Sequence, residues 1–259
     1  MVDGIRYEKV GRIGIVTLDR PEALNAMRRN MVVGLLEQLL DVERQADVRA
    51  LIITGEGRAF CAGVDLKETE ADVAAEGQEV AKDSVDTLQE LTRVLMRLPM
   101  PTIAALNGLA VGMGSEISIA CDIRVAAPQA YLWFSEAKRS LFQSNGVMFL
   151  LPRMIGYARS LEWMMSTRKI NSTELLASGL VAHVLDDEDF RSAVLRYAES
   201  VAVNSPLSLR LLKTVGQKAL AATYEEVVEM EAGAMRETME SDYIREGLRA
   251  FSEGREPRY

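Results

Sequence analysis

Short apolar segments that alternate with amphipathic ones constrain the fold of this chain most strongly. Residues 50–55 (ALIITG) and 102–106 (TIAAL) are brief aliphatic runs followed by glycine or Asn-Gly, as expected for buried strands. Residues 27–44 instead carry methionine and leucines at helical spacing, which predicts an amphipathic helix. Strands that alternate with helices in this way predict an α/β fold with parallel strands.

Other segments of the chain add to this alternation. Apolar and polar residues alternate over residues 7–18, with Gly11 and Gly14 near the turn, which predicts a β-hairpin. Residues 68–79 (ETEADVAAEGQE) are polar enough to indicate an exposed, mobile stretch, and helical spacing resumes after them up to residue 98. A short helix is expected over 114–121, with further strands over 123–126 and 180–185. Only helical patterns follow residue 204, so we divide the chain into a core, 1–203, and a helical C-terminal subdomain, 204–259.

The charge and hydropathy of the chain argue against two classes of partner. Among 259 residues, 38 acidic and 30 basic side chains leave a formal charge of −8, whereas nucleic-acid-binding proteins normally carry a basic patch. Charges interrupt every apolar stretch well short of the ~18 residues that a membrane span needs. The first ten residues also lack the apolar segment of a signal peptide. We therefore expect a cytoplasmic protein with no nucleic-acid partner and no membrane span.

A scarcity of histidine and cysteine narrows the chemistry further. The only histidine, His183, lies in the apolar run GLVAHVL, which disfavours a Ser-His-Asp triad. The only cysteines, Cys61 and Cys121, are far apart, so no closely spaced ligand pair predicts a metal site. Two lone cysteines are typical of free thiols in a reducing compartment. Acid–base chemistry then falls to carboxylates, lysine, tyrosine or backbone groups.

Two glycine-containing loops, each directly after a predicted strand, form the candidate site. They are residues 58–67 (RAFCAGVDLK) and 107–116 (NGLAVGMGSE). Glycine lets the backbone pass close to a ligand, and the second loop opens a helix whose first N–H groups favour negative charge. Two such loops facing one another would form an oxyanion hole. Taken singly, each loop is better explained as an ordinary strand-to-helix turn, and neither matches a dinucleotide-binding or Walker A motif.

Longer segments carry a more specific signal. These are DRPEALNAM (19–27), RAFCAGVDLKE (58–68), IAALNGLAVGMGSEISIACDIRVA (103–126) and the Ser-Glu pair at 135–136. They resemble the enoyl-CoA hydratase/isomerase family, the crotonase superfamily. The resemblance implies a crotonase-like spiral of ββα units with a C-terminal helical trimerisation subdomain, and a homotrimer or dimer of trimers. It also implies an acyl-CoA substrate from fatty acid metabolism, with coenzyme A as part of the substrate, no separate cofactor and no metal.

The same resemblance assigns roles to individual positions. The backbone N–H groups of Val64 and Met113 would be the two oxyanion donors. Glu116 and Glu136 occupy the two catalytic glutamate positions of the hydratases. The remaining positions would lie along the acyl-CoA: Ala62, near the adenine, and Asp65, Leu66 and Lys67.

A pair of carboxyl groups suits the hydration of a 2-enoyl thioester, which needs a held water, a base and an acid. We expect Glu136 to transfer the proton at the α-carbon and Glu116 to hold and activate the water, in a syn addition through an enolate. Without the resemblance, the better interpretation of Glu116 is a carboxylate stabilised by a helix N-terminus, and that of Glu136 is a surface charge. The functional alternatives are an isomerase that uses Glu136 alone, another enolate-forming acyl-CoA enzyme, and an acyl-CoA-binding protein without turnover.

Two departures from the family pattern bear on this chemistry. Residues 140–147 (SLFQSNGV) replace a glycine-rich segment, so Ser144 stands where a glycine carbonyl often orients the water. That carbonyl is expected to remain available. Met113 stands where the family usually has glycine, which keeps the N–H group but should narrow the mouth of the acyl site.

Overall fold

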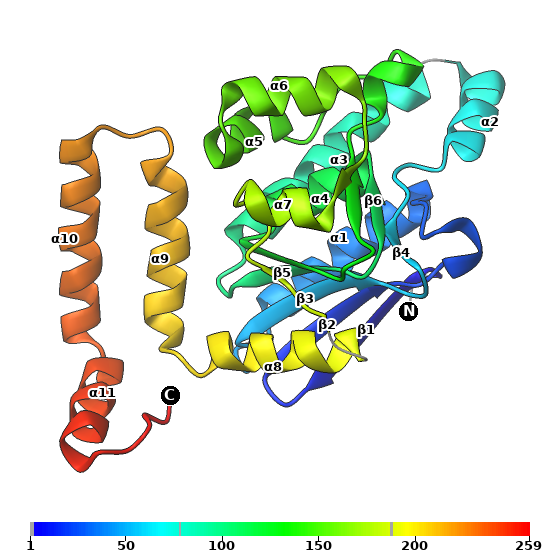
Figure 1. Ribbon diagram of the computed structural model, residues 1–259. Coiled ribbons are helices and arrows are strands. Elements are labelled where there is room, and N and C mark those ends of the chain that lie inside the picture. Colours follow the sequence, from blue (N-terminus) through cyan, green and yellow to red (C-terminus); the bar gives the residue numbers. More distant parts are fainter. Residues whose placement is uncertain (1–2, 78, 187–188) are drawn as a thin grey trace.

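A six-stranded sheet forms the centre of the molecule (Figure 1). The computed structural model describes residues 3–77, 79–186 and 189–259. In spatial order the strands are β1 (Ile5–Val10), β2 (Ile13–Leu18), β3 (Ala50–Gly55), β5 (Thr102–Leu106), β7 (Ile123–Ala126) and β10 (His183–Val184). β1 and β2 form the predicted antiparallel hairpin, and all other neighbours pair in parallel. The predicted α/β class is confirmed.

A second, smaller sheet contains β4 (Ala59–Cys61), β6 (Leu109–Val111), β8 (Tyr131–Trp133) and β9 (Ile170–Asn171). β4, β6 and β8 run in parallel, and β9 pairs with β8 in the opposite direction. β4 and β6 lie inside the segments that we expected to be loops, and that expectation is wrong for these residues. Each successive pair, β3/β4, β5/β6 and β7/β8, sends one strand to each sheet. The predicted spiral of ββα units is thereby confirmed.

Helices cover both faces of the large sheet (Figure 1). On one face, α1 (Arg29–Glu43), α3 (Glu79–Arg97) and α4 (Met113–Ala120) enclose the larger core; on the other, α8 (Phe190–Ala202) encloses a smaller one. Neighbouring residues of β3 illustrate the division, because Ile53 belongs to the larger core and Ile52 to the smaller. Burial on both faces explains why these strands read as continuous apolar runs. The remaining core helices are α5 (Val147–Ile155), α6 (Tyr157–Ser166) and α7 (Ser172–Ala177).

The polar stretch at residues 68–79 contains a helix where we expected mobile chain. α2 (Leu66–Glu76) begins after Asp65, whose side chain accepts hydrogen bonds from the backbone N–H groups of Lys67 and Glu68, and it ends at Gly77 with φ +87°. An aspartate N-cap and a glycine end are strong helix signals, and they outweigh the low hydrophobicity of the stretch. Residue 78 lies outside the described residues.

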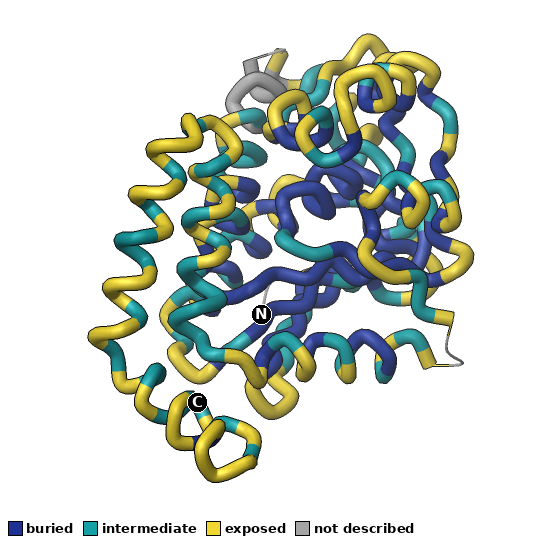
Figure 2. The backbone as a smooth tube through the Cα atoms, turned by 60° about the vertical axis from the view of Figure 1, so that its left-hand side comes forward, coloured by how far each residue is buried: buried dark blue, intermediate teal, exposed yellow. Residues whose placement is uncertain are grey.

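The last three helices stand apart from the two sheets as an arm (Figure 1). They are α9 (Pro206–Ala219), α10 (Tyr224–Glu240) and α11 (Asp242–Glu253). Every residue of α9 and α10 is described and none is buried, and Figure 2 shows these two helices in the exposed and intermediate colours. Lys213 joins α9 to the core, because its Nζ lies 2.7 Å from Asp122 Oδ2 and donates to the carbonyl oxygens of Leu95 and Met100.

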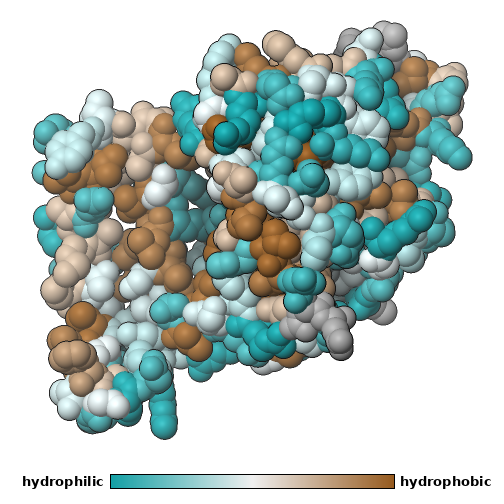
Figure 3. Space-filling view, viewed as in Figure 1, coloured by the Kyte–Doolittle hydropathy of each residue, from teal (hydrophilic) through white to brown (hydrophobic). Residues whose placement is uncertain are grey.

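Apolar side chains gather on the surface of this arm (Figure 3). The large apolar residues that are more than half exposed there are Leu212, Tyr224, Met235, Met239, Leu248 and Phe251. Their number on three amphipathic helices is typical of a surface that packs against another protein surface. Within the described residues, no helix is both long enough and apolar enough to cross a membrane.

Candidate active site

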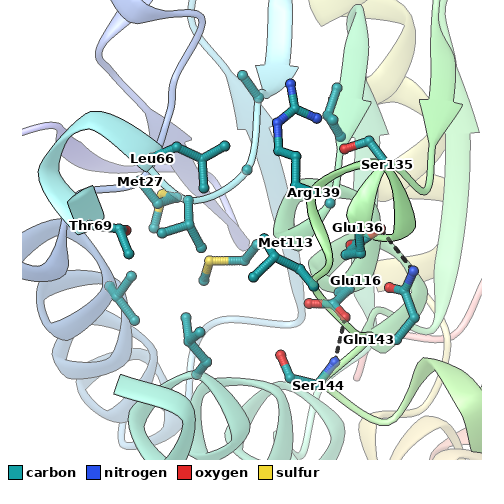
Figure 4. A pocket seen from close by; sticks show the side chains of 18 of the residues that line it. Met27, Leu66, Thr69, Met113, Glu116, Ser135, Glu136, Arg139, Gln143 and Ser144 are labelled. Atoms are coloured by element: carbon teal, nitrogen blue, oxygen red, sulfur yellow. Dashed lines mark hydrogen bonds between the residues drawn. The ribbon is translucent and has the colours of Figure 1, made fainter. Parts of the chain in front are cut away.

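A cavity of about 1100 Å³ lies between the small sheet, the first turns of α2, the α3 helix and residues 139–144 (Figure 4). One face of the small sheet forms a wall of the cavity through Leu109 and Val111 of β6 and through Tyr131 and Trp133 of β8. Residues between them point the other way into the core, as strand geometry requires. The alternation along these strands could not be recognised in the sequence, because strands of three residues are too short to show a repeating pattern.

The first glycine bend, residues 61–65, connects β4 to α2 and is anchored by backbone pairing. Met27 N–H donates to Gly63 O at 2.8 Å, and Asp65 N–H donates to Met27 O at 2.9 Å. Gly63 adopts φ +93°, a conformation that glycine adopts without strain. Between these two bonds, the N–H group of Val64 has no acceptor among the described residues.

The second glycine bend, residues 111–116, connects β6 to α4. Gly112 has φ +52° and its N–H donates to Trp133 O at 3.0 Å. Met113 is the first residue of α4, a position whose N–H has no partner within the helix. No described residue outside α4 accepts a hydrogen bond from it either.

The two bends lie against one another through their glycines. A Cβ atom added to Gly63 would lie 2.9 Å from Val111 O and 3.6 Å from Met113 N. A Cβ atom added to Gly114 would lie 2.4 Å from Cys61 O. Only glycine permits both approaches, so the two bends lie close together, and Val64 and Met113 both line the cavity.

Glu116 extends from the first turn of α4 and is buried beside the cavity. Its Oε1 accepts a hydrogen bond from Ser144 N–H at 3.0 Å, and its Oε2 accepts one from Asn145 Nδ2. Burial raises the pKa of Glu116, and the negative charge of Glu136 adds to the rise. The two donors oppose it, because hydrogen bonds to a carboxylate favour its ionised form.

Glu136 begins a short 3₁₀ helix, Glu136–Arg139, and is also buried. Its Oε2 accepts a hydrogen bond from Gln143 Nε2 at 2.8 Å. A Cβ atom added to Gly112 would lie 3.4 Å from Oε1, so this oxygen sits over Gly112 of the second bend. No other described residue donates a hydrogen bond to Oε1. Burial raises the pKa of Glu136. Hydrogen bonds from its own backbone N–H and from Gln143 act in the opposite direction, because they favour the ionised form.

Three consecutive residues hold the two carboxyl groups. Gln143, Ser144 and Asn145 each donate one hydrogen bond to Glu136 or Glu116, as the dashed lines in Figure 4 show for Gln143 and Ser144. The carbonyl of Ser144, which we expected to be available, accepts a hydrogen bond from Gln89 Nε2 at 3.0 Å. The only sequence signal for this support was the run of polar residues where the family has glycines.

The other predicted site residues divide into two groups. Ala62 and Leu66 line the cavity, and the side chain of Met113 extends into it. Asp65 does not line it. Its carboxylate caps α2 and lies 2.6 Å from Arg20 Nη1, which lowers the pKa of Asp65. Lys67 does not line it either and is exposed.

The two cysteines and the histidine do not line the cavity. Burial raises the pKa of both Cys61 and Cys121 to about 12, so neither forms a thiolate near neutral pH. His183 is exposed on β10 and packs edge-on against Tyr197, with ring centroids 5.1 Å apart. The cavity instead combines two free N–H groups with two carboxyl groups. Such a set can polarise a carbonyl oxygen and move a proton at the neighbouring carbon.

Comparison with known proteins gives this geometry a context. The sequence profile of the enoyl-CoA hydratase/isomerase family matches residues 8–259. The chain is 32% identical to 1,2-epoxyphenylacetyl-CoA isomerase of Escherichia coli, over 94% of this chain and 93% of that protein. It is 31% identical to enoyl-CoA hydratase EchA19 of Mycobacterium tuberculosis, over 97% of this chain and 94% of that protein. The crystal structure of an enoyl-CoA hydratase from Bacillus anthracis superposes with a TM-score of 0.94 at 31% identity, covering 99% of each chain.

Proposed function

The chain belongs to the enoyl-CoA hydratase/isomerase family, and from this premise we propose that it is an enoyl-CoA hydratase. The reaction is the syn addition of water to a 2-enoyl-CoA thioester through an oxyanion-stabilised enolate. One observation carries the proposal: two unpaired backbone N–H groups and two buried carboxyl groups share a single cavity. The coenzyme A belongs to the substrate, and the proposed reaction requires no other cofactor and no metal.

The mechanism follows from the different surroundings of the two carboxyl groups. The thioester oxygen accepts hydrogen bonds from Val64 and Met113 N–H, which stabilise the negative charge of the enolate. Glu116 accepts two hydrogen bonds and is the ionised partner, so it takes a proton from water as the oxygen bonds to the β-carbon. Glu136 accepts one hydrogen bond from another residue, Gln143, besides that of its own backbone N–H, and in the proposed mechanism it acts in its neutral form. Its Oε1 then gives a proton to the α-carbon, and the enolate electrons form the new C–H bond.

The remaining roles follow the position of each residue. Ala62 would lie near the adenine, and Leu66 along the acyl-CoA, because both line the cavity. Asp65 would act indirectly, because it caps α2 and pairs with Arg20 and so holds the first bend in place. Lys67 would contact the coenzyme A from its exposed position outside the cavity. The apolar surface of the arm supports assembly as a homotrimer or dimer of trimers.

Ultraviolet absorbance tests the proposal directly. Purified protein mixed with crotonyl-CoA, and with longer 2-enoyl-CoA esters, should remove the enoyl absorbance, and mass spectrometry should find the 3-hydroxyacyl product. Glu136→Gln and Glu116→Gln should each lower kcat by about 10²–10⁴, the usual contribution of a general acid or base. Folded protein that hydrates no chain length would refute hydratase activity. Tight acyl-CoA binding by calorimetry without any product would instead indicate a binding protein.

A second candidate, a double-bond isomerase, is favoured by one observation. Both oxygens of Glu116 are held by protein donors, whereas Oε1 of Glu136 is free to exchange a proton with two substrate carbons in turn. The family to which the chain belongs is also described as containing isomerases. Glu116→Ala separates the two, because it should abolish hydration but leave isomerisation of a 3-enoyl-CoA largely intact.

A further inference from the structure

Gln143 has an unusual environment for a half-buried amide. Its Nε2 donates to Glu136 Oε2 at 2.8 Å, and the residue lines the cavity. Its Oε1 is buried and has no hydrogen-bond partner among the described residues. Most buried polar atoms in proteins have a partner, so an unpaired acceptor beside an active-site carboxyl group calls for an explanation. Figure 4 shows the amide next to both Glu116 and Glu136.

The orientation of this amide restricts where the proton of Glu136 can reside. Turning the amide over would place its acceptor, Oε1, against the acceptor Oε2 of Glu136, which is unfavourable unless Oε2 carries a hydrogen. In the observed orientation Oε2 instead receives the Nε2 hydrogen. When Glu136 is neutral, its proton therefore belongs on Oε1, the oxygen over Gly112.

We infer that Gln143 is a positioning residue that places the transferable proton of Glu136 on Oε1, where it faces the α-carbon of the acyl group. The inference rests on the proposed function, because it assumes that an enolate forms on the two N–H groups. The other charged residues that line the cavity are Glu116 on α4, whose charge interacts with that of Glu136, and Arg139, whose side chain extends away from Glu136 in Figure 4. Arg29 on α1 and Glu68 and Asp72 on α2 also line it.

The test replaces the amide group of Gln143 without changing the length of the side chain. Gln143→Met removes the donor, and we expect kcat for crotonyl-CoA to fall about 10–100-fold, less than for loss of the acid itself, with KM changing far less. Because the Gln143 hydrogen bond lowers the pKa of Glu136, its loss should move the alkaline limb of the pH profile of kcat to higher pH. A residue that only supported the fold would not move that limb.

A second reaction separates this inference from the proposed function. Exchange of the α-protons of butyryl-CoA in D₂O, followed by NMR, needs the enolate and Glu136 but no addition of water. If the wild-type protein exchanges these protons without hydrating crotonyl-CoA, the hydratase proposal fails and the exchange rate of Gln143→Met still decides the role of Gln143. If the folded wild-type protein does neither, both are overturned.

Two further variants control for folding. Gln217→Met removes a similar hydrogen bond, from Gln217 Nε2 to Met96 O at 2.8 Å, but lies on α9 and should leave both rates unchanged. Gln143→Glu keeps the shape of the side chain and donates only when protonated, so its activity should fall at neutral pH and recover in part as the pH is lowered. If both Gln143 variants retain wild-type rates and an unmoved alkaline limb, the inference is wrong.

Discussion

The two glycine bends supply the same chemical group, one free N–H each, but different interactions hold them in place. The first bend relies on backbone pairing with Met27 and on polar contacts near the surface. Asp65 caps α2 and pairs with Arg20, and both side chains retain some exposure. α2 itself is polar, and none of its described side chains is buried.

The second bend is held almost entirely by buried contacts. All eight residues of α4 are buried, and Gly114 packs directly on the backbone of β4. At the far end of α4, the buried guanidinium of Arg124 donates hydrogen bonds to the carbonyl oxygens of Ser118 and Cys121, and also to that of Leu180. These bonds satisfy carbonyl groups that a helix end leaves unpaired.

This difference indicates that the two bends have different roles in the site. In the proposed reaction the second bend contributes an N–H group, carries Glu116 and lies beneath Glu136 Oε1, so three reacting groups would depend on its position. The first bend contributes only its N–H group and one edge of the cavity. Changes near the second bend should therefore affect both activity and stability, whereas changes to the anchors of the first should act mainly on stability.

Proline substitution at the two N–H groups should have the largest effect. Met113→Pro removes a donor at the first position of a helix, where proline is well tolerated and no internal hydrogen bond is lost. We expect kcat to fall about 10²–10³-fold, the cost of losing one oxyanion donor. Val64→Pro should cause a similar loss. Steady-state kinetics measure both, and Met113→Ala, which keeps the N–H, separates the amide from the side chain. Equal losses in Met113→Pro and Met113→Ala would contradict the role of the amide.

Much of the fold around the two bends could be predicted from the sequence. Apolar periodicity located the hairpin, the buried strands β3 and β5 and the helix α1, because each is long enough for a repeat to be visible. Glycines directly after two strands located both bends. The strands β4 and β6 were missed because they are three residues long, and α2 was missed because its N-cap, Asp65, was interpreted as part of a ligand-binding loop.

The support of the two carboxyl groups could not have been predicted in this way. Glu116 and residues 143–145 are almost thirty positions apart, and nothing in a local pattern says that three successive polar residues point toward two glutamates. That arrangement depends on how η2, the 3₁₀ helix Glu136–Arg139, and the start of α5 turn the chain back over α4. Side-chain direction in such an irregular segment follows from tertiary packing.

Removing the guanidinium at the far end of α4 should cause the next largest effect. Arg124→Met leaves several buried carbonyl groups without donors, and each unsatisfied group costs about 1–3 kcal/mol. Part of this cost will be relieved by relaxation, so we expect a loss of about 3 kcal/mol in the free energy of unfolding. Urea denaturation measures it. Arg124→Lys should recover only part of the loss, because an ammonium group cannot reproduce the planar set of donors. Wild-type stability in Arg124→Met would show that α4 needs no such cap.

A methyl group between the two bends should have a somewhat smaller effect. In Gly114→Ala the added Cβ would lie 2.4 Å from Cys61 O, so the bends must separate, at a cost of about 2 kcal/mol. The separation should also lower kcat, because it moves Met113 N–H relative to Val64 N–H. Gly216→Ala is the matched control, since Gly216 lies within α9 with nothing inside 4 Å of the added atom, and it should stabilise the helix by about 1 kcal/mol. Equal effects of the two substitutions on unfolding would mean that the bends do not depend on close contact.

The anchor of the first bend should give the smallest effect, and one that depends on pH. Asp65→Ala removes the N-cap of α2 and should cost about 0.5–2 kcal/mol at pH 7 with little change in kcat. Because pairing with Arg20 lowers the pKa of Asp65 in the folded protein, this stabilisation is present above the unfolded pKa of about 3.9 and is lost as the pH falls through the folded value. The difference in melting temperature between wild type and Asp65→Ala should therefore shrink in acid. Asp65→Asn, which retains a capping side chain but no charge, should lie between them at pH 7. A large fall in kcat for Asp65→Ala, with stability unchanged, would show instead that this carboxylate takes part in the reaction.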